Sequence, residues 1–209
     1  KPIIRLDGEE VFNIIDVAES GDCLTPHQRA YHEKTKVRDS AILMLFLGTG
    51  IRIRELVGLN NDDLNFKDNS FVVTRKGGNK TILYFDDDVA AALQRYLDYK
   101  EKNYEDLKEP TALFISNNKG RITVRAVENL VQKYAKIVSP LKKISPHKLR
   151  STYGTQLYRA TGDIYIVADV LGHKDVNTTR KHYAAVSDDN RRGVVGKVKL
   201  KPDGDENND

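Results

Sequence analysis

The sequence predicts an α+β fold that is mainly helical and includes a small three-stranded antiparallel sheet. Apolar residues recur at helical spacing in several segments, most clearly over residues 124–138, which follow the helix-capping residue Thr123. Three short runs have strand character and are separated by turn-forming residues: 64–66, 71–74 and 81–85. A helical domain that carries one small sheet is the simplest arrangement of these elements.

The N-terminal segment is predicted to be a capped helix followed by a polar connection. The capping-box spacing at residues 7–10 starts the helix, which should end near Gly21. Residues 25–36 are polar, so we expect His27 and His32 in this stretch to be solvated rather than functional.

The remaining helices are predicted from apolar periodicity, capping residues and terminal glycines. They are residues 37–47, 52–59, 89–100, 124–138, 146–160 and 163–171, and a last helix that begins near residue 175 or 177 and carries Tyr183. Between the second and third strands Lys76 stands beside Gly77 and Gly78, so we expect a mobile basic hairpin tip. The alternation over residues 194–200 could form a short tail strand or extension.

We expect one domain over residues 1–186 and a partly disordered C-terminal tail, residues 187–209. No internal repeat or low-complexity linker interrupts the first part, whereas the end of the chain is polar and acidic. The chain begins at Lys1 without an initiator methionine or a signal-peptide pattern, which suggests a fragment of a longer protein.

Composition favours an intracellular protein that can bind a polyanion. Lys plus Arg exceeds Asp plus Glu by 34 to 30, and by 34 to 26 without the acidic segment 203–209. The single cysteine, Cys23, excludes an intramolecular disulfide and fits a reducing compartment. The longest apolar run, residues 41–47, is far shorter than the roughly 20 residues of a membrane span. We therefore expect a soluble cytoplasmic protein with no membrane partner.

Chemically reactive side chains gather in the segment from Ser145 to Tyr183. Ser145 and the proline after it suit the start of a helix, which places His147 and Arg150 near one another on its first turns. A helix N-terminus attracts anions. The next two helices are expected to present His173 and Tyr183, so two imidazoles, a guanidinium and a phenol come from one short stretch.

Four blocks of this chain resemble the signature of the tyrosine recombinases, the family of phage integrases and Xer-type enzymes. The blocks are Thr49-Gly50-Ile51-Arg52-Ile53-Arg54-Glu55-Leu56, the hairpin Arg75-Lys76-Gly77-Gly78-Asn79-Lys80, the pair His147-x-x-Arg150 with Leu171-Gly172-His173, and Thr178-Thr179 before Tyr183. The resemblance extends over about residues 7–186. It implies the catalytic-domain fold of this family and DNA strand exchange as the activity.

Phosphodiester chemistry explains why such side chains would act together. Attack on a phosphodiester increases the negative charge on the non-bridging oxygens, so catalysis consists mainly of positioning and charge stabilisation. The resemblance gives this task to Arg52 and Arg150, because each guanidinium stays protonated and can hold two oxygens. It makes Tyr183 the nucleophile that forms a covalent 3′-phosphotyrosine.

The same resemblance implies roles for the remaining residues of the motifs. Lys76, or Lys80 in its place, would protonate the departing 5′ oxygen. His147 would act as a base or proton relay, and His173 would donate to a phosphate oxygen. Glu55 would orient the cluster.

The implied partners are a double-stranded DNA recombination site and other recombinase protomers, assembled as a tetramer on DNA. Arg54, Lys80 and Lys148 are predicted to make further DNA contacts. No cofactor and no metal is expected, and a metal-dependent nuclease is disfavoured because the five histidines are scattered and no metal-binding motif is present.

One spacing departs from the family pattern. The nucleophile usually follows the second histidine by nine residues, whereas Tyr183 follows His173 by ten. One extra residue rotates a side chain by roughly 100° on a continuous helix, so we expect a kink or a later helix start. Other nearby tyrosines, Tyr153, Tyr158 and Tyr165, are better explained by helix packing or surface exposure.

The sequence thus predicts site-specific DNA recombination, as in the integration and excision of a mobile element. Chromosome-dimer resolution by a Xer-type recombinase is an alternative within the same chemistry. Relaxation of DNA by a type IB topoisomerase uses similar residues without exchanging partners. A DNA-binding module that has lost catalysis is disfavoured because every catalytic residue type is present.

Overall fold

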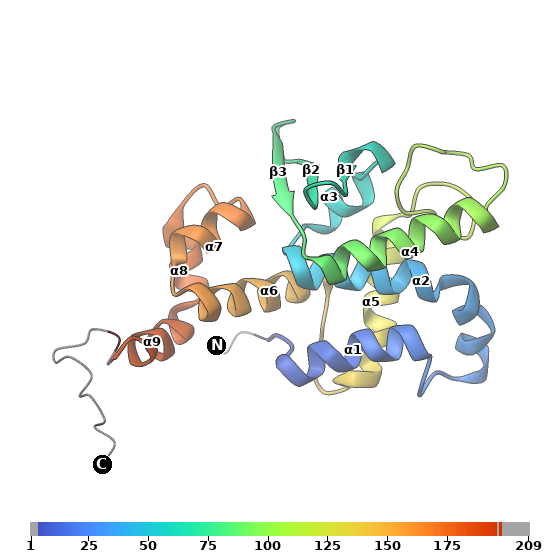
Figure 1. The fold of residues 1–209 in the computed structure, drawn as a ribbon. Helices are drawn as coiled ribbons and strands as arrows, with labels where there is room; N and C mark the ends of the chain where they lie inside the picture. The colour runs from blue at the N-terminus through green and yellow to red at the C-terminus, as the bar shows by residue number, and fades with distance from the viewer. Residues whose placement is uncertain (1–3, 196, 198–209) are drawn as a thin grey trace, which may run out of the picture. The chain divides into compact units, whose positions relative to one another are not determined.

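The computed structural model describes residues 4–195 and 197, without the side chains of residues 184, 185 and 188. The chain forms two compact units, the first ending at Gly154 and the second beginning at Thr155. Figure 1 shows the helices and strands of both units. The expected fold class, mainly helical with one small antiparallel sheet, is confirmed.

Helices make up most of the first unit. They are α1 (Gly8–Ser20), α2 (Pro26–Thr49), α3 (Ile53–Gly58), α4 (Asp87–Asn103), α5 (Val124–Val138), the 3₁₀ turn η1 (Asn61–Asp63) and the first part of α6 (Pro146–Thr161). Helix α2 packs against α1 and α4, while α5 packs against α1 and α3. A single cluster of buried apolar side chains joins these helices to the inner face of the sheet.

The N-terminal helix begins and ends where its capping residues predict. The Asp7 carboxylate accepts a hydrogen bond from the Glu10 N–H, and the Glu10 carboxylate accepts one from the Asp7 N–H, each at 2.8 Å. Gly21 ends the helix in the left-handed conformation at φ 75°.

The expectation of a solvated polar connection over residues 25–36 was wrong, since this segment is the first half of α2. Thr25 and Gln28 form a second capping box, and Pro26 occupies the first turn. His32 is consequently buried, with 2% of its surface exposed, and its Nε2 lies 2.8 Å from the Ala18 carbonyl oxygen. His27 is exposed, as expected.

A buried charged cluster connects α2 to α5. The Asp39 carboxylate accepts hydrogen bonds from the Arg38 guanidinium at 2.9 and 3.1 Å and from the Tyr134 hydroxyl at 2.9 Å. Arg38 also donates to the Ile115 carbonyl at 3.1 Å. Burial raises the pKa of the Tyr134 phenol, so it stays protonated and can donate.

Replacing Asp39 with alanine is expected to destabilise the first unit by about 3–5 kcal/mol, because it leaves the buried Arg38 guanidinium without its counter-charge. Denaturant unfolding followed by circular dichroism measures the change. A matched control is Glu33→Ala on the same helix, whose exposed ion pair with Lys36 should contribute little. Equal unfolding midpoints for Asp39→Ala and the wild type would contradict the prediction.

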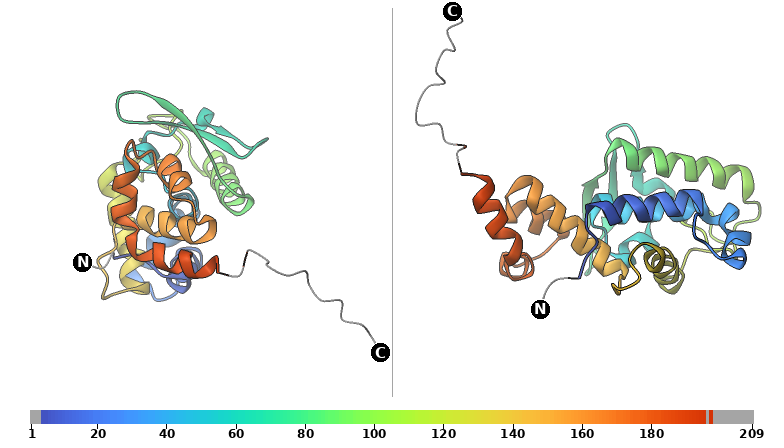
Figure 2. Two further views of the ribbon diagram at one scale, coloured as in Figure 1. Left: turned by 90° about the vertical axis from the view of Figure 1, so that its left-hand side faces the viewer. Right: turned by 90° about the horizontal axis from the view of Figure 1, so that it is seen from below.

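The sheet consists of β1 (Leu64–Asn65), β2 (Ser70–Thr74) and β3 (Lys80–Tyr84) in the order β1-β2-β3, with antiparallel pairing throughout. All three predicted strands are confirmed, with bounds shifted by about one residue. Phe71, Val73 and Leu83 are buried against the helices, so the register is fixed by the apolar face. The β2–β3 hairpin stands out from the helices of this unit (Figure 2).

The second unit contains the last part of α6 and the helices α7 (Ile164–Leu171), α8 (Val176–His182) and α9 (Ala184–Gly193). Asp163 caps α7, and Gly172 ends it at φ 66°, as expected. Helix α9 was not predicted. Residues 194, 195 and 197 form no strand, and the rest of the segment for which a strand or extension was predicted lies outside the described residues.

Candidate active site

A tight loop between α2 and α3 positions the first predicted arginine. Gly50 ends α2 in the left-handed conformation at φ 66°, which an L side chain rarely adopts. The Thr49 hydroxyl donates to the Leu45 carbonyl at 2.5 Å and accepts from the Ile51 N–H at 3.3 Å. Arg52 then occupies the N-cap of α3, where its guanidinium is partly exposed.

The second predicted arginine contacts this same loop. Arg150 Nη1 donates to the Gly50 carbonyl oxygen at 2.6 Å, although 100 residues separate the two in sequence. Arg150 is buried, with 6% of its surface exposed, and extends from the second turn of α6. The structure therefore brings Arg150 to the loop that carries Arg52.

The N-terminal turn of α6 presents two further predicted residues. The Leu149 N–H donates to the Ser145 carbonyl oxygen at 3.1 Å, which starts the helix where the serine predicts it. His147 is exposed on this turn, and Lys148 is half-buried. His147 is thus accessible to a ligand at a helix N-terminus, where the backbone dipole favours an anion.

Glu55 connects α3 to the hairpin through a residue that sequence reasoning did not single out. Its Oε1 accepts from the Arg52 N–H at 3.0 Å, and its Oε2 lies 3.8 Å from Arg52 Nη1. The same Oε2 lies 3.4 Å from Nη1 of Arg75. Arg75 belongs to the hairpin motif, but nothing in the sequence pairs it with a glutamate 20 positions earlier.

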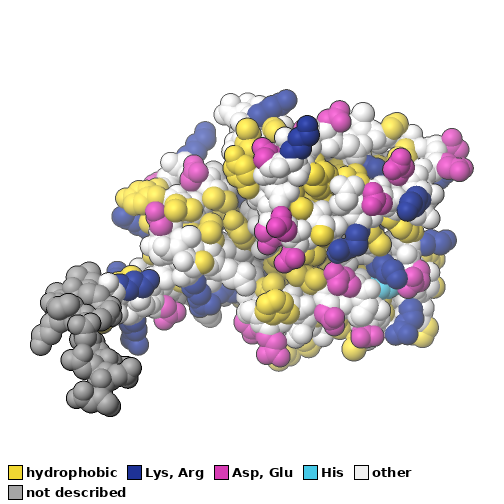
Figure 3. All heavy atoms as spheres, viewed as in Figure 1, with side chains coloured by type: hydrophobic (Ala, Val, Ile, Leu, Met, Phe, Trp, Pro, Cys, Tyr) yellow, Lys and Arg dark blue, Asp and Glu magenta, His cyan; other side chains and the backbone are white. Residues whose placement is uncertain are grey.

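The predicted basic residues of the hairpin are accessible. Lys76 and Lys80 are exposed on either side of the turn formed by Gly77 and Gly78, both of which have positive φ. Arg54 on α3 is also exposed. Figure 3 shows Lys and Arg side chains at the hairpin end of the first unit, among apolar and acidic side chains, and others scattered over the rest of the visible face. Such a surface can contact a polyanion without any concave pocket.

In the second unit a buried threonine links the second histidine to the helix that precedes Tyr183. His173 Nδ1 lies 2.6 Å from the Thr179 hydroxyl, and Thr179 is fully buried. The Thr179 carbonyl oxygen accepts from the Tyr183 N–H at 3.0 Å. Thr179 on α8 therefore contacts both His173 and Tyr183. The Thr178-Thr179 motif signalled its presence, but its function as a link is visible only in the structure.

Tyr183 lies at a break between two helices. It is the C-cap of α8 and the N-cap of α9, with φ −113° and ψ 19°. Helix α8 is unbroken from Val176 to His182, so the break lies at Tyr183 itself. The Tyr183 ring is buried in edge contacts with Tyr158 and His182, at centroid distances of 6.4 and 5.1 Å.

The alternative tyrosines behave as packing and surface residues. Tyr158 is buried beside Tyr183, and burial raises the pKa of the Tyr153 phenol. Tyr165 is 61% exposed, and its ring lies against the Arg180 guanidinium.

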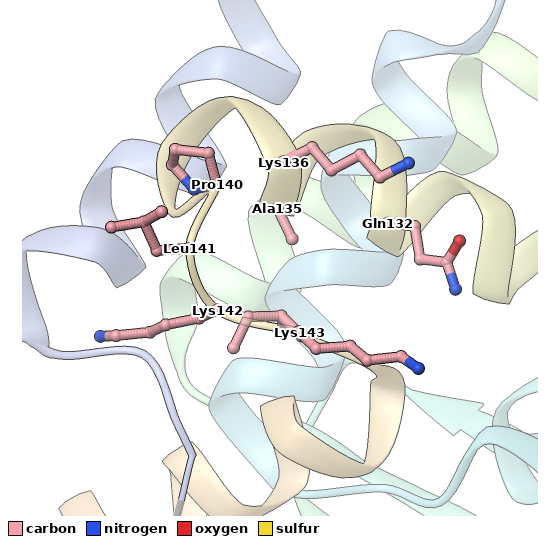
Figure 4. Close-up of a pocket in the computed structure, with 8 residues that line it drawn as sticks. Gln132, Ala135, Lys136, Pro140, Leu141, Lys142 and Lys143 are labelled. Carbon is pink, nitrogen blue, oxygen red and sulfur yellow. The ribbon is translucent and has the colours of Figure 1, made fainter.

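A cavity of about 360 Å³ lies between the end of α5 and the loop before α6, and none of the predicted site residues lines it. Three lysines line it, but the amino group of Lys142 points to the opposite side from those of Lys136 and Lys143 (Figure 4). Lys142 is paired with Glu10 at 2.5 Å. This cavity therefore does not present a converging set of cations.

Within the part of the chain that the structure describes, no group of three or more His, Cys, Asp or Glu side chains is arranged to hold a metal ion. Likewise, none of the helices in this part combines the length and apolar character needed to cross a bilayer.

Comparison with known proteins identifies clear relatives. Residues 5–190 match the phage integrase family. Tyrosine recombinase XerC of Thermodesulfovibrio yellowstonii is 39% identical over 150 residues, which cover 70% of this chain and 50% of the relative. Tyrosine recombinase XerS of Streptococcus thermophilus is 32% identical over 192 residues, which cover 90% of this chain and 53% of the relative.

A solved structure agrees with these relatives. The crystal structure of XerA recombinase has a TM-score of 0.75 and 27% identity, over 93% of this chain and 64% of that chain. The chain spans about half the length of the curated relatives it matches.

Proposed function

Because the chain belongs to the phage integrase family of tyrosine recombinases, we propose that it is the catalytic domain of a site-specific DNA recombinase. The domain cleaves and rejoins DNA strands through a covalent 3′-phosphotyrosine. Its partners are a double-stranded recombination site and other protomers in a tetramer on DNA. The protein acts in the cytoplasm.

The observation that carries the proposal is the hydrogen bond from Arg150 to the Gly50 carbonyl. It joins two motifs that are 100 residues apart and fixes one guanidinium beside the loop that carries the other. Two guanidinium groups held in this way can bind the non-bridging oxygens of one phosphate and stabilise the charge that develops during attack.

The cleavage step is a transesterification. The Tyr183 oxygen forms a bond to phosphorus, and the bond between phosphorus and the 5′ oxygen breaks. The phenol proton passes to His147, and the 5′ oxygen takes a proton from Lys76. His173 donates a hydrogen bond to a phosphate oxygen and is itself oriented by Thr179. Attack by a 5′ hydroxyl from a second duplex reverses the step and exchanges strands.

Surrounding cations strengthen the hold on DNA. Arg54, Lys80 and Lys148 contact phosphates flanking the cleaved bond, which adds affinity without sequence specificity. Raising the salt concentration from about 50 to 200 mM should therefore reduce binding at least about tenfold.

A nicked duplex library with a randomised central sequence tests the proposal. A nick placed beside the cleaved bond releases a short strand, so the covalent adduct accumulates and survives denaturing electrophoresis. We expect the wild type to form this adduct in low salt and equally well in excess EDTA, because guanidinium groups supply the charge stabilisation. Sequencing the trapped DNA gives the preferred site. An adduct that requires a divalent metal, or cleavage without any adduct, would contradict the proposal.

The second candidate function is chromosome-dimer resolution, which uses the same chemistry. The relatives named XerC and XerS favour it. Strand exchange between two selected duplexes distinguishes both recombinase roles from a type IB topoisomerase. A topoisomerase relaxes supercoiled plasmid that lacks the selected site and exchanges no strands.

A further inference from the structure

Arg75 occupies the base of the hairpin that carries Lys76. It directly follows β2, and its N–H donates to the Asn79 carbonyl oxygen at 2.7 Å, while its own carbonyl accepts from the Gly78 N–H at 3.0 Å. These two bonds close the turn. Only 10% of the Arg75 side chain is exposed, whereas the neighbouring Lys76 is exposed. The Arg75 guanidinium is therefore directed into the protein and not into solvent.

The guanidinium of Arg75 meets a carboxylate that already has a second cationic neighbour. Glu55 Oε2 lies 3.4 Å from Arg75 Nη1 and 3.8 Å from Arg52 Nη1. The Glu55 side chain is 5% exposed, and among the described residues this oxygen accepts no hydrogen bond. A buried carboxylate is costly unless it is paired with a cation. Arg75 is the closer of the two cations.

The charge balance of this trio has a consequence for Arg52. One carboxylate and two guanidinium groups have a net charge of +1. Arg52 can therefore face a phosphate while Arg75 balances the negative charge of Glu55. In an Arg75 variant the Arg52 N–H still donates to Glu55, which keeps Arg52 in place. The base of the hairpin would lose its ion pair with α3.

We propose that Arg75 is a positioning residue, which anchors the hairpin base to Glu55 and thereby places Lys76 for proton donation to the 5′ oxygen. This inference rests on the proposed function. Misplacement of a catalytic group by about 1 Å can reduce a rate by about 10²-fold, so a loose anchor is expected to slow cleavage on that scale.

The test compares two leaving groups on one duplex selected from the library. In the first substrate the scissile phosphate carries its normal 5′ oxygen, and in the second a 5′ sulfur replaces that oxygen. A thiolate leaves without protonation because thiols have a pKa of about 8.5, so the second substrate does not need Lys76. We expect Arg75→Gln to cleave the oxygen substrate about 10²-fold more slowly than the wild type and the sulfur substrate at nearly the wild-type rate.

Three further variants complete the comparison. Lys76→Ala should show the same pattern, and adding Arg75→Gln to it should slow oxygen cleavage no further, because both changes remove one function. Arg125→Gln is the matched control, since Arg125 is an exposed arginine on α5 whose nearest carboxylate, Glu128, is 3.9 Å away. It should cleave both substrates like the wild type.

The outcomes separate this inference from the proposed function. If Arg75→Gln slows the two substrates equally while Lys76→Ala is rescued by sulfur, Arg75 does not act through Lys76. Normal cleavage of the oxygen substrate by Arg75→Gln would also overturn the inference alone. Absence of any adduct from the wild type would refute the proposed function and this inference with it. Unfolding midpoints of all variants show whether a loss reflects misfolding, and the sulfur substrate reports activity of the folded fraction.

Discussion

Tyr183→Phe is expected to abolish the covalent DNA adduct, a loss of at least about 10³-fold, while the protein still folds and binds DNA. The substitution removes the oxygen that would bond to phosphorus and keeps the ring that packs against Tyr158 and His182. Stability should change by about 1 kcal/mol or less, the contribution of a typical hydroxyl hydrogen bond. Denaturing electrophoresis of the nicked duplex measures the adduct, and a gel-shift assay at low salt measures binding.

The matched control for this prediction is Tyr158→Phe. Tyr158 is buried in contact with Tyr183, so its substitution perturbs the same ring cluster without removing the proposed nucleophile. This variant should form the adduct. An adduct that persists in Tyr183→Phe but disappears in Tyr158→Phe or in Tyr165→Phe would transfer the role of nucleophile to the other tyrosine.

Local signals in the sequence predict most helix ends. Asp7 with Glu10, Gly21, Asp163 and Gly172 act through hydrogen bonds or backbone conformations that involve only near neighbours, and the structure has each of them as expected. These features depend on spacing of three or four residues, which is readable without knowledge of the fold.

The wrong prediction for the first half of α2 also concerns local signals. The polar composition of residues 25–36 suggested a connection, although Thr25, Pro26 and Gln28 form a complete helix start. His32 is buried because α1 lies against that turn, and a Cβ added at Gly21 would lie 2.7 Å from the His32 ring. Composition alone cannot show which face of a polar helix a neighbouring helix will cover.

Tertiary pairs account for the parts of the site that the sequence does not reveal. Asp39 meets Tyr134 across 95 residues, and Arg75 at the end of β2 meets Glu55 on α3. Such pairs follow from the packing of helices and strands, and no spacing rule specifies them. The roles assigned to the site residues remain predictions, whereas the placement of Arg150 beside the Arg52 loop is an observation.

Arg150→Lys is expected to reduce the rate of adduct formation by about 10²–10³-fold, even though the charge is retained. Arg150 Nη1 is occupied by the Gly50 carbonyl, so the guanidinium must hold this loop and a phosphate at the same time. A planar group with five N–H donors can do both, but a single ammonium group cannot reproduce the two directions. Single-turnover cleavage of the selected nicked duplex measures the effect.

The reason for choosing lysine over alanine is the burial of Arg150. Alanine would leave a cavity and free the Gly50 carbonyl, so a loss of activity could reflect loss of the fold. Lysine keeps the charge and much of the volume, and its unfolding midpoint should stay close to that of the wild type. If Arg150→Lys then cleaves as fast as the wild type, one positive charge at this position is sufficient. The guanidinium clamp, in which Arg150 holds the Gly50 loop and a phosphate together, would then be wrong. If it binds the duplex normally but cleaves slowly, the interaction belongs to the transition state, as the clamp requires.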